Sequence, residues 1–528
     1  MTRVPCLRAS SSTDALLART VHFLPSARQA RAAPGSDETD QAIQALADAI
    51  RQHRQPSAEA CSSRSLTTRL PLREGGFGST LSSLIKPYLW SLLQGRVPLG
   101  VQPLPIYGSR RGQARLKPAS PAPLASFVNR SACAEASLEC FLLPLTNCSA
   151  ELRANAPALS LGGRWTETVT HDGLLAKAAL ARVGRTAERA GRFASVALLL
   201  AALLQPNAAL RRAVCAARRA MGWPRRGSLP GQQRPLLLGL HVRHGDSCTV
   251  DALSRHNRSC EPLAAYLPAL RALKAAYGRP NERVVVYLAT DDEKVVADAL
   301  RGGGGGRGGE RAGGGGGGGR GNRGGGGGGG GDGGGGGSGG GGEFTWLVRR
   351  EAAARRVWPR NGRGELHQIE DLLRHRLVDG HADATAVLVD LLLLAQCDAL
   401  VGKFSSNVDR LALSLLAVRR GGGGGGGGGE HGSRAGTSQL LRGAAWCAAD
   451  AAGEPSQQRA SSSSGRALAW PAGPEPPQVC VPPFISLDHP WCAEWYGTMP
   501  LTRLGAQEYA GPTGDGGAEG RLVGGFQC

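Results

Sequence analysis

Two short apolar runs constrain the fold of this chain more than any other feature of its sequence. Residues 236–242 (LLLGLHV) and 284–289 (VVVYLA) have the length and composition of strands that are buried on both faces of a parallel sheet. A segment with helical spacing, 262–276, lies between them. A further unit follows in the order helix, strand, helix, at 385–396, 399–404 and 407–418. Strands that alternate with helices predict a doubly wound α/β domain.

Glycine tracts interrupt this domain at 302–342 and follow it at 421–429. We expect both tracts to be disordered loops, because they have no apolar side chains whose burial would offset the entropy of ordering. The first tract carries RGG-like arginines at Arg301, Arg307, Arg311, Arg320 and Arg323. Tracts of this kind that bind nucleic acid use interleaved aromatic residues, and this one has none. We therefore do not expect a nucleic-acid partner, and an RGG-type nucleic-acid-binding protein stays as an alternative.

The chain is basic, with 62 Lys and Arg residues against 42 Asp and Glu residues. Most of the basic residues are arginine, whose planar guanidinium binds phosphate and carboxylate groups through two parallel hydrogen bonds. This composition suits a polyanionic ligand. A GC-rich genome would raise Arg, Ala and Gly together and give the same excess. Net charge therefore decides no function class.

The thirteen cysteines include neither a CxxC pair nor a Cys/His cluster with zinc-ligand spacing, so we expect no metal site. Several lie in loop-like sequence: Cys133, Cys140, Cys148, Cys248, Cys260, Cys480, Cys492 and Cys528. Asn-x-Ser sequons occur at Asn129, Asn147 and Asn257. Both features suit an oxidising compartment, so we predict a disulfide-bonded glycoprotein of the Golgi or secretory lumen.

No membrane anchor is visible in the sequence. The longest apolar run, 196–204, has nine residues, and it is expected to be a core helix because a spanning helix needs ~20. Residues 1–35 are rich in Arg, Ser and Ala and lack the apolar centre of a secretory signal. An organelle transit peptide and an incomplete gene model both stay open for that segment.

The part of the chain before the α/β domain is expected to contribute a second ordered unit. Residues 36–65 are polar and are predicted to be a flexible lead-in, with order beginning near Leu70. In 74–93 a glycine turn opens a helix that Pro87 should kink or end early, and 95–101 is the next expected strand. A disulfide-stapled outer segment and a helical segment are expected at 126–160 and 174–221.

Polar residues cluster just past the carboxyl ends of three predicted strands, where open α/β sheets bind ligands. They are His241, Arg243, His244, Asp246 and Asp251, then Thr290, Asp291 and Asp292, then Ser405, Ser406 and Asn407. The last three open a helix in which Asp409 is placed as a capping-box partner to Ser406. A turn or a helix cap explains the second and third clusters when each is taken alone. Together, the three clusters combine arginine, hydroxyls at a helix N-terminus and carboxylates, which predicts a nucleotide pocket built without Mg²⁺.

Three of these stretches resemble the donor-site motifs of the GDP-fucose-dependent α-1,6-fucosyltransferases. They are 241–246 (HVRHGD), 287–292 (YLATDD) and 390–406 (DLLLLAQCDALVGKFSS). GGFGSTLSSL and LLQPNAALRRAVCAARRAMGW are similar to the family's first-domain glycine turn and to the helix before its donor motif. The likeness covers most of 70–420 outside the glycine insertion. It implies an α/β fold with two Rossmann-like lobes (GT-B-like), and an inverting transfer of fucose from GDP-fucose to a glycan or glycoprotein, with no cofactor.

The resemblance also implies roles for single residues. Arg243 matches the family's essential arginine, which grips the β-phosphate of the departing nucleotide. His241 and Asp390 fall where the family contacts guanosine, and Ser406 falls where it binds a phosphate. Acidic positions that shape the site match Asp246, Asp291 and Asp292.

Three positions depart from the family pattern. The proposed base of the family is a glutamate, and Asp251 stands at its position, so Asp251 and Arg243 are the implied catalytic residues. The family reads HVRRTDK where this chain reads HVRHGDS, so that His244 replaces an arginine and Ser247 replaces a lysine. Two fewer cations would stabilise a diphosphate leaving group less well, and a catalytically inactive nucleotide-sugar-binding protein is therefore an alternative. The family's C-terminal SH3-like module is not evident in 430–528, where only FISLDHPWCAEWYG looks ordered.

The expected domain organisation follows from these features. A disordered N-terminal segment is followed by an acceptor-side lobe, a nucleotide-sugar donor lobe with a disordered glycine-rich insertion at 302–342, a linker and a C-terminal segment. Their expected bounds are 1–65, 66–190, 191–420, 421–470 and 471–528.

Overall fold

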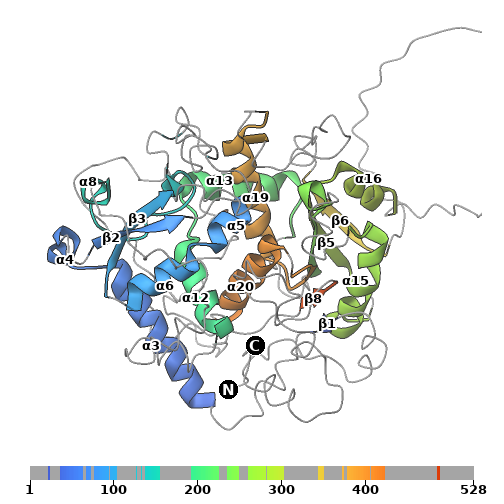
Figure 1. The fold of residues 1–528 in the computed structure, drawn as a ribbon. Helices are drawn as coiled ribbons and strands as arrows, with labels where there is room; N and C mark the ends of the chain where they lie inside the picture. The colour runs from blue at the N-terminus through green and yellow to red at the C-terminus, as the bar shows by residue number, and fades with distance from the viewer. Residues whose placement is uncertain are drawn as a thin grey trace, which may run out of the picture.

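The computed structural model describes residues 22–23, 36–63, 67–72, 76–93, 95–103, 127, 133, 137–154, 192–224, 235–248, 260–280, 282–302, 343–349, 372–373, 377–404, 406–421, 447 and 484–487. Within these ranges the protein is a mixed α/β fold with a six-stranded and a two-stranded sheet. The two sheets lie on opposite sides of the molecule with helices between them (Figure 1). Apart from Gly302 and Gly421, the expected glycine loops lie outside the described residues.

The larger sheet has the strand order β1-β8-β7-β4-β5-β6. Its strands are β1 (His22–Phe23), β4 (Leu236–Val242), β5 (Val284–Thr290), β6 (Thr345–Val348), β7 (Ala399–Gly402) and β8 (Phe484–Ser486). Of these, β1 is antiparallel to its neighbour β8, and the others run parallel. Every residue of β4 and β5 is buried, as expected of central parallel strands that are covered on both faces. The strands predicted at 236–242, 284–289 and 399–404 are confirmed, the last as a shorter strand.

Alternate side chains of β4 enter two separate cores. Leu238 and Leu240 pack with α15 (Leu263–Tyr277) and α16 (Glu293–Gly302), on what we call the α15 face of the sheet. Leu237 packs on the opposite side, which we call the α19 face. The helices of that face are α12 (Arg192–Leu203), α13 (Ala208–Ala220), α19 (Gly380–Leu394) and α20 (Asn407–Gly421). The helices predicted at 262–276, 385–396 and 407–418 are therefore confirmed, with small shifts at their ends.

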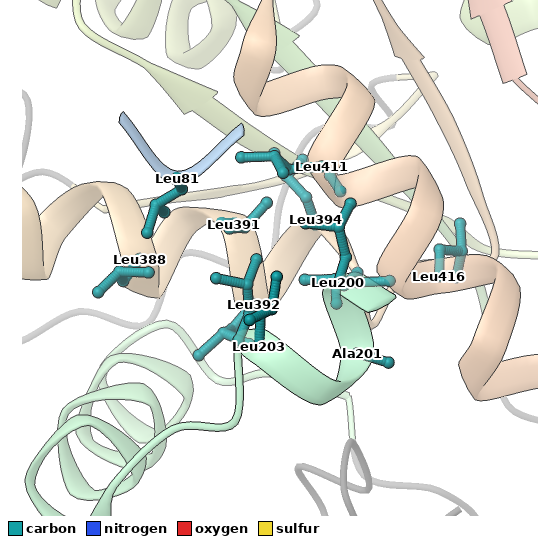
Figure 2. Packing of buried hydrophobic residues seen from close by; sticks show 14 of the residues in the cluster. Leu81, Leu200, Ala201, Leu203, Leu388, Leu391, Leu392, Leu394, Leu411 and Leu416 are labelled. Carbon is teal, nitrogen blue, oxygen red and sulfur yellow. The ribbon is translucent and has the colours of Figure 1, made fainter. Parts of the chain in front are cut away.

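The centre of the molecule is a leucine-rich core between α12, α19 and α20. Figure 2 shows Leu200 and Leu203 of α12 beside Leu392 and Leu394 of α19, with Leu411 of α20 close by. All of these side chains are buried, and burying one leucine completely contributes about 1.5–3 kcal/mol. The run 196–204 is buried throughout, so its prediction as a core helix is confirmed.

The N-terminal unit packs on the other side of these central helices. Its elements are α3 (Ser36–Arg54), α4 (Ala58–Ser62), β2 (Thr67–Leu72), α5 (Phe77–Ser82), α6 (Ile85–Leu93) and β3 (Val97–Pro103). β2 and β3 form the parallel two-stranded sheet, which confirms the strand expected at 95–101. Contacts of α3 and α6 with α12, and of α5 with α20, make one continuous core with the larger sheet.

The prediction of a disordered, flexible segment up to residue 65 is wrong for 36–63. α3 spans 19 residues, and it buries Ile43, Leu46, Ala47 and Ile50. Their spacing of three, one and three residues places them on one helical face. Gln41, Asp48 and Gln52 lie off this buried face, and counting them together with the buried residues made the composition misleading.

The predicted 74–93 helix is interrupted, but not at the expected place. α5 ends at Ser82 and α6 begins at Ile85, so the interruption precedes the proline instead of following it. Pro87 is then the third residue of α6, within the first helical turn. In that turn the missing N–H has no intrahelical acceptor to lose, and proline is therefore tolerated.

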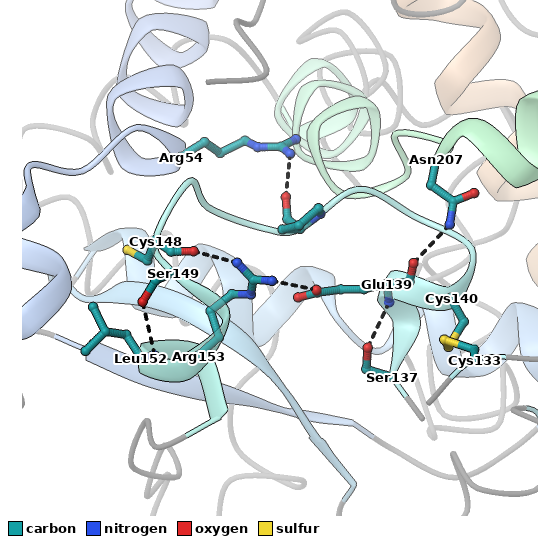
Figure 3. Close-up of polar contacts among 11 residues, drawn as sticks. Arg54, Cys133, Ser137, Glu139, Cys140, Cys148, Ser149, Leu152, Arg153 and Asn207 are labelled. Atoms are coloured by element: carbon teal, nitrogen blue, oxygen red, sulfur yellow. Dashed lines mark hydrogen bonds and ion pairs between the residues drawn. A yellow bond between two sulfur atoms is a disulfide. The ribbon is translucent and has the colours of Figure 1, made fainter. Parts of the chain in front are cut away.

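Arg54, the last residue of α3, ties the N-terminal unit to the rest of the fold. One guanidinium nitrogen donates to the carbonyl of Pro144 at 2.9 Å (Figure 3), and another donates to the carbonyl of Ala202 near the C-terminus of α12. Burial lowers the pKa of Arg54, and the helix C-terminus offsets part of that cost because its carbonyl groups carry partial negative charge. Burial also raises the pKa of the neighbouring Tyr88 to about 12.

The segment 137–154 includes η1 (Leu138–Cys140) and α8 (Ala150–Ala154) and is held by Arg153. Its guanidinium binds a carboxylate oxygen of Glu139 at 2.8 Å and the carbonyl of Cys148 at 2.5 Å (Figure 3). The expected disulfide stapling of 126–160 is confirmed for the described part, because two disulfides end in it.

Four disulfides join cysteines of the described residues: Cys61–Cys148, Cys133–Cys140, Cys215–Cys447 and Cys248–Cys260. Five of the loop cysteines singled out in the sequence are among them, and Cys480, Cys492 and Cys528 lie outside the described residues. The other three partners are Cys61, Cys215 and Cys447; the first two lie in helices and were missed by a search for loop cysteines. Among the helices that the structure describes, none combines the length and the apolar character needed to cross a membrane.

Candidate functional site

The parallel strands β6, β5, β4 and β7 end side by side at the carboxyl edge of the larger sheet. The predicted polar residues follow these ends, at Arg243 and His244, at Asp291 and Asp292, and at Ser406. His241 stands one residue before the end of β4, and its contact with α20 shows that it points to the α19 face. Arg243 lies two residues farther on and meets Asp291.

His241 is held by a carboxylate from α20. Its Nδ1 lies 2.9 Å from Oδ2 of Asp409, and both side chains are buried. The same oxygen accepts the backbone N–H of Lys403 at 3.0 Å. Gly402 permits this close packing, because a Cβ there would lie 2.5 Å from Cγ of Asp409. With Nδ1 engaged, Nε2 is the ring nitrogen that His241 can offer to a ligand.

Arg243 and Asp291 meet across the ends of β4 and β5. A guanidinium nitrogen of Arg243 lies 3.8 Å from Oδ2 of Asp291, whose side chain is 3% exposed, whereas that of Arg243 is 27% exposed. Oδ1 of Asp291 accepts the backbone N–H of His244 at 2.8 Å. Asp291 therefore fixes the backbone at the end of β4 and keeps the guanidinium beside it at the edge of the sheet.

His244 connects three elements. Its Nδ1 lies 2.7 Å from Oδ2 of Asp292, and its Nε2 lies 2.9 Å from the carbonyl oxygen of Glu261, two residues before α15. Both ring nitrogens are thus engaged by protein oxygens. The position at which the resembled family has a second arginine serves here to tie the ends of β4 and β5 to the start of α15.

The N-terminus of α20 brings a buried hydroxyl to the same edge. Ser406, immediately before α20, is 8% exposed, and its Oγ has no hydrogen-bond partner among the described residues. The predicted capping box is wrong, because the carboxylate of Asp409 is engaged elsewhere and the N–H of Ser406 donates to the carbonyl of Lys403 at 2.9 Å. The side-chain oxygen of Asn407 accepts from an arginine within the helix. A buried hydroxyl at the positive end of a helix suits an anionic oxygen.

Asp390 forms a buried network that the sequence did not reveal. Its Oδ1 accepts the hydroxyl of Tyr287, a β5 residue, at 2.7 Å, and also accepts from a guanidinium nitrogen of Arg349. Arg349 directly follows β6, and the same nitrogen donates to the carbonyl of Ala386 in α19 at 3.1 Å. The ring of Trp223 packs edge-on against Tyr287, with 5.2 Å between centroids. Asp390 is thereby linked to the carboxyl end of the outermost strand, β6.

Electrostatics keep both donors of this network in their donating forms. Burial raises the pKa of Tyr287 well above its ordinary value, and the charge of Asp390 raises it further. Burial acts to lower the pKa of Arg349, but the charge of Asp390 overrides it and leaves that pKa raised. Tyr287 therefore stays protonated and Arg349 stays charged across the physiological range.

Several predicted site residues are not placed by the structure. Asp251 and Ser405 lie outside the described residues, and of Asp246 and Ser247 the structure describes only the backbone, within η2 (Gly245–Cys248). The disulfide Cys248–Cys260 joins the two ends of the segment that contains Asp251.

The role of Arg349 was not predicted from the sequence, because β6 was not predicted as a strand. This strand, TWLV, has only four residues and follows the long glycine tract directly, so it offered no periodic pattern. The role of Asp409 was missed for another reason. A carboxylate three residues after Ser406 fits a capping box, and only the packing of α20 on Gly402 directs it to His241.

Comparisons with known proteins give a likeness in structure and none in sequence. No family model matches the chain, and no curated protein matches its sequence. The structure is similar to a crystal structure of NodZ α-1,6-fucosyltransferase with GDP, with a TM-score of 0.32 and 14% identity, covering 66% of this chain and 91% of that one. The same enzyme soaked with GDP-fucose gives a TM-score of 0.31 and 15% identity, covering 66% and 93%, and fucosyltransferase NodZ from Bradyrhizobium gives 0.31 and 14%, covering 66% and 94%. Because identity and TM-score are both low, function has to be inferred from the residues of the site.

Proposed function

We propose that this protein is a glycosyltransferase that moves fucose from GDP-fucose to a hydroxyl group of a glycan or glycoprotein. The observation that carries the proposal is the ion pair of Arg243 and Asp291 at the ends of β4 and β5, together with the buried hydroxyl of Ser406 that follows the neighbouring strand β7. A guanidinium and a helix N-terminus supply positive potential for a diphosphate. Side chains that can bind a nucleoside, His241 and Asp390, lie on the same α19 face.

The proposed reaction inverts the sugar carbon in one displacement. The acceptor oxygen forms a bond to the anomeric carbon of fucose and passes its proton to Asp251. The bond between that carbon and the β-phosphate oxygen breaks, and its electron pair leaves with GDP. Arg243 and the N-terminus of α20 stabilise the charge that develops on the departing diphosphate. No cofactor takes part in this scheme, and GDP-fucose is a substrate.

Each proposed lobe would contain one of the two sheets. We propose that 191–420, which contributes most strands of the six-stranded sheet, is the donor lobe, and that 66–190, which contributes the two-stranded sheet, is the acceptor lobe. β1 and β8 lie outside 191–420 yet extend the larger sheet, so both ends of the chain add strands to the proposed donor lobe. The four disulfides suit an oxidising compartment, and we propose the Golgi or secretory lumen.

Replacement of Arg243 by alanine tests the proposal. Loss of one group that stabilises developing charge typically lowers turnover by about 10²–10³-fold, and we expect Arg243→Ala to abolish detectable transfer from GDP-fucose. Arg271→Ala is the matched control, because Arg271 forms an exposed ion pair with Glu343 on the outer side of the fold. Near-normal turnover in Arg243→Ala would refute the assignment.

The role of Asp251 has a separate test. Asp251→Asn should retain GDP-fucose binding and lose transfer, because it removes a base and no donor contact. Loss of both together would count against its role as the base.

Ligand screening separates the alternatives. Both ring nitrogens of His244 are engaged by Asp292 and Glu261, so neither can bind a donor phosphate as a second arginine would, which favours an inactive nucleotide-sugar-binding protein as the second candidate. Thermal shift with GDP, GDP-fucose, UDP-sugars and RNA, followed by donor hydrolysis, distinguishes the cases. GDP binding without hydrolysis or transfer would favour the inactive protein. Salt-sensitive RNA binding that vanishes on deletion of 302–342 would favour the nucleic-acid-binding alternative.

A further inference from the structure

The Tyr287–Arg349–Asp390 network has a feature that an ordinary buried ion pair does not need. Both protein donors converge on one carboxylate oxygen, Oδ1 of Asp390. The other oxygen, Oδ2, receives no hydrogen bond from a described residue and is not enclosed by the protein, since the side chain keeps 10% of its surface exposed. A carboxylate oxygen accepts hydrogen bonds and cannot donate one, so Oδ2 is the oxygen of Asp390 that can accept from a bound molecule. An N–H group from a ligand would satisfy it.

The network lies where a nucleoside would be bound. Arg349 and Asp291 follow neighbouring strands, and Arg243 follows the next strand, so their three positions form a row along the carboxyl edge. Neighbouring strands are about 4.8 Å apart. The row therefore continues through β7 to Ser406 and spans three strand intervals, or about 14 Å. A nucleoside diphosphate has this length, with the diphosphate toward Arg243 and Ser406 and the base toward Asp390.

We propose that Tyr287 and Arg349 are positioning residues that fix Asp390 as an acceptor for the Watson–Crick edge of guanine and so set the base selectivity of the site. This inference rests on the proposed function and extends it to Arg349, which lies outside the three motifs, and to Tyr287, to which the resemblance assigns no role. Guanine presents adjacent N–H donors at N1 and N2. Adenine presents a lone pair at N1, and uracil flanks its one N–H with two carbonyl oxygens. Both bases would therefore place a hydrogen-bond acceptor next to the carboxylate, which can only accept. Hypoxanthine keeps the N1 donor and lacks the N2 amino group.

The perturbed groups on either side of Asp390 support this role. Tyr287 keeps its proton and Arg349 keeps its charge, so neither releases Oδ1 to the ligand at physiological pH. The packing of Trp223 on Tyr287 and the bond from Arg349 to the carbonyl of Ala386 limit the movement of both donors. Asp390 is consequently held by two elements, β5 and the end of β6, that do not belong to its own helix.

Binding of GDP, IDP, ADP and UDP by isothermal titration calorimetry tests the inference on the full chain with its disulfides intact. The readout is the ratio of the dissociation constants for IDP and GDP, because these ligands differ only in the 2-amino group. A hydrogen bond to a charged group raises affinity about tenfold or more, so we expect the wild type to bind GDP at least about tenfold more tightly than IDP. Tyr287→Phe and Arg349→Met should bring this ratio toward one, and Arg349→Lys should restore part of it.

Two controls separate positioning from general stability. Tyr88→Phe removes the hydroxyl of a fully buried tyrosine in the N-terminal unit, and Arg271→Met breaks an exposed ion pair. Both should leave the IDP-to-GDP ratio unchanged. A purely structural role of the network would lower the melting temperature of Tyr287→Phe and leave that ratio at its wild-type value, which would overturn the inference.

The outcomes also separate this inference from the proposed function. A wild type that binds GDP and transfers fucose, with a ratio unaffected by Tyr287→Phe, overturns the inference and leaves the function standing. A wild type that binds no guanine nucleotide overturns both. Tyr287→Phe deletes a single oxygen atom, so the test does not depend on whether Arg349→Met folds.

Discussion

Replacement of Gly402 by alanine should destabilise the protein through one neighbour, Asp409. A Cβ on Gly402 would lie 2.5 Å from Cγ and 2.9 Å from Oδ2 of Asp409, and the three nearest atoms all belong to that residue. The carboxylate would have to turn away from β7. It would then release Nδ1 of His241 and the backbone N–H of Lys403, which it holds at 2.9 and 3.0 Å.

The magnitude follows from these two hydrogen bonds. A hydrogen bond to a charged group contributes about 1.5–3 kcal/mol, so Gly402→Ala should cost about 3–6 kcal/mol. Asp409→Ala breaks the same two bonds and should cost a similar amount. Once position 409 is alanine, the Cβ at 402 meets no carboxylate, so the double variant should lose little more than either single variant. The coupling energy should therefore be about 3 kcal/mol or more.

Thermal unfolding followed by circular dichroism, without reductant, measures this coupling. For domains of this size 1 kcal/mol corresponds to roughly 2–4 °C, so each single variant and the double variant should melt about 6–24 °C below the wild type. Gly100→Ala is the control, because a Cβ there has no atom within 4 Å. Melting of Gly402→Ala at the wild-type temperature, or single losses that add up in the double variant, would show that position 402 does not act through Asp409.

Two further predictions concern the N-terminal unit. Loss of the Cys61–Cys148 disulfide should lower the free energy of unfolding more than loss of Cys133–Cys140, because their sequence separations are 87 and 7. The entropy of the unfolded chain gives losses of about 4–5 and about 2–3 kcal/mol. Equal melting shifts of the two paired Cys→Ser variants would contradict this prediction. Burial lowers the pKa of His53 from 6.5 to about 4, so the unfolded chain binds a proton below about 6.5 that the folded chain binds only near 4. Above about pH 6.5 the ring is neutral in both states, and below it the free energy of unfolding should fall by up to about 3 kcal/mol toward pH 4. His53→Gln should flatten this part of the pH–stability curve. An unchanged slope in that variant would argue against a role of His53.

The elements that the sequence predicted well are those whose environment is uniform along the chain. β4 and β5 are buried on both faces, so every residue of 236–242 and 284–289 is selected for the same property, and a short window is enough to recognise them. α3 was missed because its apolar residues occupy one face only, and composition averaged over 36–65 hides a periodic pattern.

For the candidate site, the chain by itself determined which polar residues follow which strand, and hence that Arg243, Asp291 and Ser406 reach one edge of the sheet. That result needs only strand order along the chain and parallel pairing. Tertiary structure decided the partners: His241 with Asp409, His244 with Asp292 and the start of α15, Asp390 with Arg349, and helical Cys61 with Cys148. Burial patterns are local properties that neighbouring residues repeat, whereas a hydrogen bond of 3 Å depends on the packing of elements that lie far apart in the sequence.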